Sequence, residues 1–139
     1  MSFSLEIITP DGKAYSDEID YVVLPTAEGE IGILPGHIPL IAMIVPGELK
    51  IIRSGKEEFL AVDKGFVRIM GDIIAVLTEA AINIDEIHLS VIEEAEARAK
   101  KALEEARLRK DIDPAELQRL EATARFAFTQ KIAKQKRHY

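Results

Sequence analysis

Glycine and proline are confined almost entirely to the first half of this 139-residue chain. All eight glycines lie between Gly12 and Gly71, and Pro114 is the only proline after Pro46. Because both residue types interrupt regular secondary structure, turns must crowd the first half, whereas the second half can form long uninterrupted elements. Hydrophobic residues make up 47% and charged residues 30%, a globular balance that allows one core or two small ones. We therefore expect two structurally different parts.

The first part shows the two-residue period of β-strands that bury one face. Residues 3–7 alternate apolar and polar side chains, and the turn residues of segment 9–12 (TPDG) follow directly. Further short strand candidates lie between glycine-containing turns, at residues 18–24, 48–53, 57–62, 65–70 and 73–78. Many short strands with turns about every eight to twelve residues are typical of an antiparallel sandwich or barrel.

The second part changes to the three- and four-residue spacing of amphipathic helices. Asp113 before Pro114 is the signature of an N-cap, and Glu116 completes a capping box. This helix start divides the second part into two helices of about 22 residues, each about 33 Å long, which form an antiparallel hairpin. Three residues are alternative caps for the first helix: Asn83, Asp85 and Ser90.

Alanine supplies much of the apolar stripe of both predicted helices. The first stripe contains Ala95, Ala99 and Ala106, and the second contains Ala124 and Ala127. Since apolar burial contributes about 25 cal/mol per Å², an alanine seam holds far less than a leucine seam. The composition therefore predicts a hairpin of low stability that undocks before the first part unfolds.

Charge and residue types exclude several classes of function. Residues 1–83 carry six Lys/Arg against thirteen Asp/Glu, a net of −7, and residues 84–139 carry twelve against eleven, a net of +1, which sum to −6. This acidity argues against nucleic-acid binding. The absence of cysteine and the wide separation of the three histidines argue against a metal site and against nucleophilic catalysis. The longest apolar run, residues 38–45, is too short to insert into a membrane, and no secretory signal is visible.

A family resemblance is carried by residues 28–40, whose sequence is EGEIGILPGHIPL. This segment is similar to the Gly-Glu-(Leu/Ile)-Gly-Ile-x-Pro-Gly-His-x-Pro-Leu hallmark of the epsilon subunits of bacterial-type rotary ATP synthases. Segments 9–12 (TPDG) and 64–67 (KGFV) agree with that family in the same order. The resemblance covers essentially the whole chain.

The resemblance implies a β-sandwich of about ten antiparallel strands in residues 1–84, followed by a C-terminal α-helical hairpin in residues 85–139. It implies a non-catalytic rotor subunit in the central stalk of a proton-transporting ATP synthase, which couples the gamma subunit to the loops of the membrane c-ring. Such a subunit is peripheral to the membrane, at the cytoplasmic face of the plasma membrane. The alternative left by the residues alone is a free-standing adaptor that presents a sandwich and a coiled-coil hairpin to another partner.

The resemblance also implies residue roles. Glu30 and His37 correspond to positions near the membrane ring. The hairpin of the family inhibits ATP hydrolysis when it extends along gamma toward the catalytic beta and alpha subunits. Four basic residues of the second helix would then face acidic surfaces of those subunits: Arg119, Arg125, Lys131 and Lys134.

Nucleotide binding is one point where the chain departs from the family pattern. Several members bind ATP through Ile/Leu-Asp-x-x-Arg-Ala at the start of the first helix, but the ungapped alignment places His88 and Val91 at the acidic and arginine positions. Sliding by three residues restores Asp85 and still lacks the arginine. Arg98 and Arg125 match later basic positions and are the remaining nucleotide candidates. We predict no cofactor, and ATP binding that is absent or weaker than about 1 mM.

Overall fold

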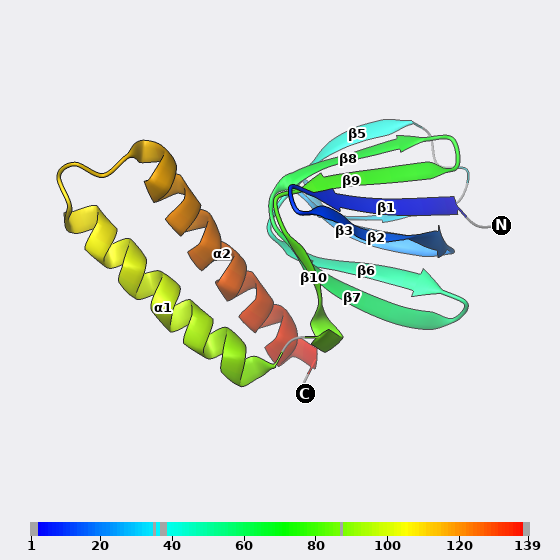
Figure 1. Cartoon of the computed structure of the whole chain (residues 1–139). Helices are drawn as coiled ribbons and strands as arrows, with labels where there is room; N and C mark the ends of the chain where they lie inside the picture. Colours follow the sequence, from blue (N-terminus) through cyan, green and yellow to red (C-terminus); the bar gives the residue numbers. More distant parts are fainter. Residues whose placement is uncertain (1–2, 35, 37–38, 87, 138–139) are drawn as a thin grey trace.

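The computed structural model describes residues 3–34, 36, 39–86 and 88–137. Figure 1 shows a strand-rich body, the sandwich, beside a pair of long helices, the hairpin. Ten strands occur within the described residues: β1 (Phe3–Thr9), β2 (Gly12–Ile19), β3 (Tyr21–Thr26), β4 (Gly29–Ile33), β5 (Leu40–Ile44), β6 (Gly47–Arg53), β7 (Lys56–Val62), β8 (Gly65–Met70), β9 (Ile73–Thr78) and β10 (Ala81–Asn83). The short 3₁₀ turn η1 (Ile84–Glu86) leads to the helices α1 (Leu89–Leu108) and α2 (Pro114–Arg137).

The strands form one strongly curved sheet in the order β10-β7-β6-β3-β5-β8-β9-β1-β2, with β4 paired to β3. The predicted sandwich followed by two helices is confirmed. One pairing within the described residues departs from the antiparallel prediction: β1 pairs with β9 in parallel, with Ser4 opposite Ile73 and Ile8 opposite Leu77. Nearly the whole sandwich separates these strands along the chain, so no tight turn forces them to run in opposite directions.

The core of the sandwich consists of large side chains that alternate along the strands. In β1 the buried positions are Phe3, Leu5 and Ile7, as the two-residue period predicts. Leu24 and Ile74 are equally buried from other parts of the sheet. Full burial of such a side chain stabilises the fold by about 1.5–3 kcal/mol, so the sandwich carries a substantial core of its own.

The prediction of one strand at residues 18–24 is wrong, because the chain bends at Asp20. Ile19 is buried at the end of β2, and the next buried side chain is Val22, so the inward-facing period slips by one residue. Asp20 fixes the bend: its amide donates to the Ile52 carbonyl at 2.9 Å, and its carboxylate accepts from the Ser54 amide at 2.9 Å. β2 therefore pairs with β1, whereas β3 pairs with β6.

The second helix begins as predicted. Asp113 Oδ1 accepts the amide hydrogen of Ala115 at 3.0 Å, so Asp113 caps α2, and Pro114 is its first residue. Glu116 does not close the expected capping box. Its Oε1 lies instead 4.0 Å from Arg109 Nη2.

None of the three alternative caps begins the first helix. His88 occupies the N-cap of α1 without a side-chain bond. Asn83 instead caps the preceding turn η1, where its Oδ1 accepts from the Asp85 amide at 2.9 Å. Ser90 is already the second residue of α1. The long helix is held by its packing rather than by a cap at its start.

The hairpin lies against one end of the sandwich, with α2 between α1 and the strands (Figure 1). Helix α2 contacts β6, β7 and η1. The buried apolar residues of the helices are mostly alanine, and they are Ile92, Ala99, Ala106, Ala127 and Ala133. The predicted small-residue seam is present.

Candidate functional site: the hairpin seat and the apolar sheet face

The hairpin seat is the part of the sandwich that α2 contacts. It includes Asp63, directly after β7. Asp63 is only 2% exposed. Its amide donates to the Ala80 carbonyl at 3.0 Å, and the Thr78 hydroxyl donates to the Asp63 carbonyl at 2.9 Å. Backbone and hydroxyl bonds thus fix the corner that carries this carboxylate, independently of the hairpin.

Arg125 of α2 meets that carboxylate with both arms of its guanidinium. Nε donates to Oδ1 at 2.8 Å and Nη2 donates to Oδ2 at 3.0 Å. Glu79 adds a second acid, with Oε2 3.7 Å from Arg125 Nη2. The bond to Asp63 is the largest cause that raises the pKa of Arg125 above its ordinary value. Bidentate pairs of this kind are the strong, orientation-specific charge contacts of proteins.

A second ion pair fastens the two helices to each other. Glu96 of α1 is buried, and its Oε1 accepts from Lys131 of α2 at 3.3 Å and lies 2.9 Å from Lys100 Nζ. The hydrogen bond from Lys100 is the largest cause that lowers the pKa of Glu96 below its ordinary value of 4.5, and the bond from Lys131 acts in the same direction, while burial opposes both. The carboxylate is therefore stabilised in its charged form.

The base of the hairpin adds a small apolar contact with the sandwich. Ala61, Ile84, Ile92 and Ala133 form one buried cluster. Beside it, Lys134 Nζ donates to the Ile84 carbonyl at 3.2 Å. Phe59, Ile82 and Phe126 pack against the cluster but stay partly exposed. With only four buried side chains, the cluster is much smaller than the sandwich core.

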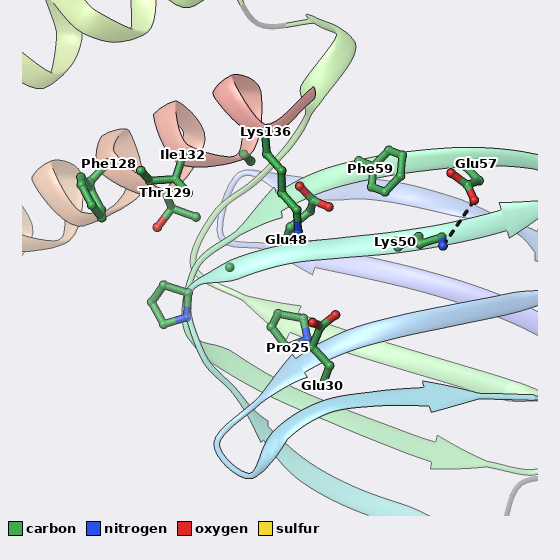
Figure 2. A pocket seen from close by; sticks show the side chains of 13 residues that line it. Pro25, Glu30, Glu48, Lys50, Glu57, Phe59, Phe128, Thr129, Ile132 and Lys136 are labelled. Carbon is green, nitrogen blue, oxygen red and sulfur yellow. Dashed lines mark ion pairs between the residues drawn. The ribbon is translucent and has the colours of Figure 1, made fainter. Parts of the chain in front are cut away.

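A groove of about 630 Å³ remains between α2 and the strands. Figure 2 shows Phe128 and Ile132 on the helix side and Phe59 on the sheet side, with Glu30 beside Pro25. Glu30 is exposed on β4. His37, the other predicted ring contact, lies outside the described residues.

The remaining predicted residues fall into two groups. Arg125, Lys131 and Lys134 are engaged within the chain, as described above. Arg119 and Arg98 are exposed, and their side chains form no ion pair or hydrogen bond with another described residue. The two nucleotide candidates thus differ, because the guanidinium of Arg125 is already bound by carboxylates and that of Arg98 is not.

The sequence analysis did not identify an exposed apolar surface on β5, β8 and β9, which we call the apolar sheet face. Its members are Ile41, Met43, Phe66, Met70, Ile73 and Leu77, each at least 50% exposed. Strand register places Met43 opposite Phe66, and Phe66 opposite Leu77. The sequence does contain a sign of this surface, because β9 is apolar at nearly every position. In a strand with one solvated face, apolar residues alternate with polar ones. A hollow of about 560 Å³ lies at this surface.

Comparisons with known proteins identify the family. The family profile described as "ATP synthase, Delta/Epsilon chain, beta-sandwich domain" matches residues 2–84. The ATP synthase epsilon chain of Halalkalibacterium halodurans is 38% identical over 122 residues, covering 87% of this chain and 92% of the relative. The chain belongs to the ATP synthase epsilon chain family. The family resemblance inferred from residues 28–40 is therefore confirmed.

Two further matches extend over nearly the whole epsilon-family chain. The ATP synthase epsilon chain of Shouchella clausii is 37% identical over 136 residues, which is 97% of each protein. A chain in the cryo-EM structure of the Euglena gracilis mitochondrial ATP synthase, described as OSCP/F1/c-ring in rotational state 1, has a TM-score of 0.64 at 24% identity. That match covers 95% of this chain and 81% of the other, so the two share a fold that includes the helices.

Two further features are absent from the described residues. No helix among them combines the length and apolarity needed to cross a membrane. The same residues contain no group of three or more His, Cys, Asp or Glu side chains able to hold a metal ion.

Proposed function

We propose that this epsilon-family chain is a non-catalytic rotor subunit in the central stalk of a proton-transporting ATP synthase, with its apolar sheet face bound to the gamma subunit. The exposed side chains of β5, β8 and β9 carry this proposal. Exposed apolar side chains that gather on one face of a sheet mark an interaction site, because their burial against a partner is favourable. The exposed Arg68 lies among them, opposite Ile41 on β5. Family membership supports a partner within the ATP synthase.

The other partners follow from the family resemblance. Glu30, together with His37, is assigned to the loops of the membrane c-ring, which makes the subunit peripheral to the membrane on its cytoplasmic side. The hairpin is assigned a regulatory role, in which it restrains ATP hydrolysis after leaving its seat and contacting the catalytic beta and alpha subunits. Its small apolar contact with the sandwich supports this role, since an inhibitory arm must be able to undock.

Binding to gamma tests the assignment of the apolar sheet face. Phe66→Glu places a negative charge between Met43 and Leu77. It should weaken capture of the chain by immobilised gamma about 100-fold or more, as expected for the loss of a buried aromatic anchor. Phe128→Glu is a matched control, because Phe128 is 51% exposed against 54% for Phe66 but lies on α2. Equal binding by both variants would contradict the assignment.

Removal of residues 85–139 tests the regulatory role. The truncated chain should still assemble with gamma, and the assembled complex should hydrolyse ATP faster than the complex with the full chain. A rate that is unchanged in a complex of the same composition would contradict inhibition by the hairpin.

A further inference from the structure

Three of the four cations that the family resemblance assigns to the catalytic subunits are already bound within the docked chain. Arg125 is held by Asp63, Lys131 by Glu96 and Lys134 by a backbone carbonyl. Arg119, on the same helix, is exposed and makes no such contact with another described residue. Internal acceptors therefore bind three of the four cations assigned to an acidic partner while the hairpin is docked.

We propose that Asp63 is an internal competitor of that partner, so that docking of the hairpin and inhibition are mutually exclusive uses of the Arg125 guanidinium. The inference rests on the proposed function and adds the residue pair that regulates it. When α2 is seated, Arg125 forms its ion pair with Asp63. When α2 leaves the seat, Arg125 is released to bind an acidic protein surface.

The geometry of Asp63 suits this role. Its backbone bonds to Ala80 and Thr78 lie wholly within the sandwich, so its carboxylate stays in place whether or not the hairpin is seated. Glu79, 3.7 Å from the same guanidinium, adds a second acid to the site. The surface that the family resemblance assigns to Arg125 is acidic as well. Asp63 is buried and Arg125 is partly exposed. Removing either partner loses the bidentate contact and destabilises the seated state.

Removing Asp63 and removing Arg125 should have different effects on inhibition. Loss of Asp63 unseats the hairpin and leaves Arg125 free for the catalytic subunits, so inhibition should increase. Loss of Arg125 unseats the hairpin as well but removes one of the four cations assigned to the inhibitory contact, so inhibition should increase less. A merely structural ion pair would give the same result for both changes.

The first measurement is hydrogen exchange of the isolated full-length chain. Asp63→Asn and Arg125→Gln should each speed exchange of α2 amides about tenfold or more, while the amides of β1 and β9 keep their protection. Arg119→Gln is the matched control on the same helix and should leave exchange unchanged. Unchanged α2 exchange in Asp63→Asn would overturn the proposal without reference to any activity.

The second measurement is ATP hydrolysis by the assembled complex. Asp63→Asn should lower the rate about twofold or more, and Arg125→Gln should give a higher rate than Asp63→Asn. Equal rates for these two variants would overturn the competition, provided that deletion of residues 85–139 raises the rate in the same assay. If the deletion has no effect, the chain does not inhibit hydrolysis, and the proposed competition is wrong as well. The exchange data then still decide whether the Asp63–Arg125 pair holds the hairpin.

Discussion

The sandwich and the hairpin are built from the same chain but held by different forces. The sandwich buries leucine, isoleucine, valine and phenylalanine, and Leu5, Leu24 and Ile74 are at most 1% exposed. The hairpin buries mostly alanine, and its fixed points are the Arg125–Asp63 and Lys131–Glu96 ion pairs. One part is therefore held mainly by area removed from water, and the other by less apolar area together with a few directional contacts.

This difference explains how one part can be stable while the other moves. Apolar burial at about 25 cal/mol per Å² is cumulative and non-directional, so a large core unfolds only as a whole. An ion pair is directional and can be exchanged for a similar pair with another protein at a small net change in free energy. A regulatory arm fastened by charge can therefore undock without unfolding its support.

The largest difference between the two parts should appear when leucine is shortened in each. Leu5→Ala removes a fully buried side chain and should lower the free energy of unfolding by about 2–5 kcal/mol. Leu108→Ala changes a leucine that is 84% exposed on α1 and should alter it by less than about 0.5 kcal/mol. Urea denaturation followed by circular dichroism measures both, and comparable losses would contradict the comparison.

A smaller and local effect is expected from enlarging the alanine seam. Ala106 is fully buried, so Ala106→Leu forces the helices apart and should cost about 1–3 kcal/mol. The cost should be confined to the hairpin, visible as faster hydrogen exchange in α1 and α2 with unchanged protection in the strands. Ala97→Leu, at an exposed position on α1, is the control. Loss of protection in the strands would mean that sandwich and hairpin share one core.

A weaker effect is expected from acid. The pKa of Glu96 is lowered in the folded chain, so its charge stabilises the hairpin fully above the ordinary pKa of 4.5, and this contribution is lost as the pH falls through the lower folded value. Helix protection should therefore decrease below about pH 4.5. Glu96→Gln should flatten that part of the pH profile, whereas Glu93→Gln, at an exposed position on the same helix, should not. Parallel profiles for the two variants would contradict the assignment.

The sequence predicted the features that depend on local pattern. Alternation located the buried face of β1, and Asp113-Pro114 located the start of α2. The bend at Asp20 was not predicted, because the residues on both sides of it are typical of strands. Its one sign is that the apolar residues Ile19 and Val22 are three positions apart, whereas a continuous strand buries every second residue.

The candidate site was predictable only in part. The basic residues of α2 could be named from the resemblance, but the partner of Arg125 could not. Asp63 lies 62 residues earlier, and its sequence context is that of any acidic residue after a strand. The ion pair exists only because the hairpin docks on that corner. The apolar sheet face had a local signal in the unbroken apolar run of β9, but an exposed strand and a doubly buried strand give the same pattern.

The smallest expected effect is that of ATP on the hairpin. Binding a nucleotide needs cations held together around the phosphates, and Val91 stands where the family motif has its arginine. Arg125 is already engaged in a bidentate pair with Asp63, and Arg98 is an exposed charge whose contribution solvent would screen. We therefore expect no heat of binding in isothermal titration with magnesium ATP, or a Kd weaker than about 1 mM. Asp63→Asn serves as the comparison, because it frees Arg125 without restoring the missing arginine and should also fail to bind. A micromolar isotherm with the unmodified chain would contradict the alignment of residues 82–92, and one with Asp63→Asn alone would show that the ion pair, rather than Val91, excludes the nucleotide.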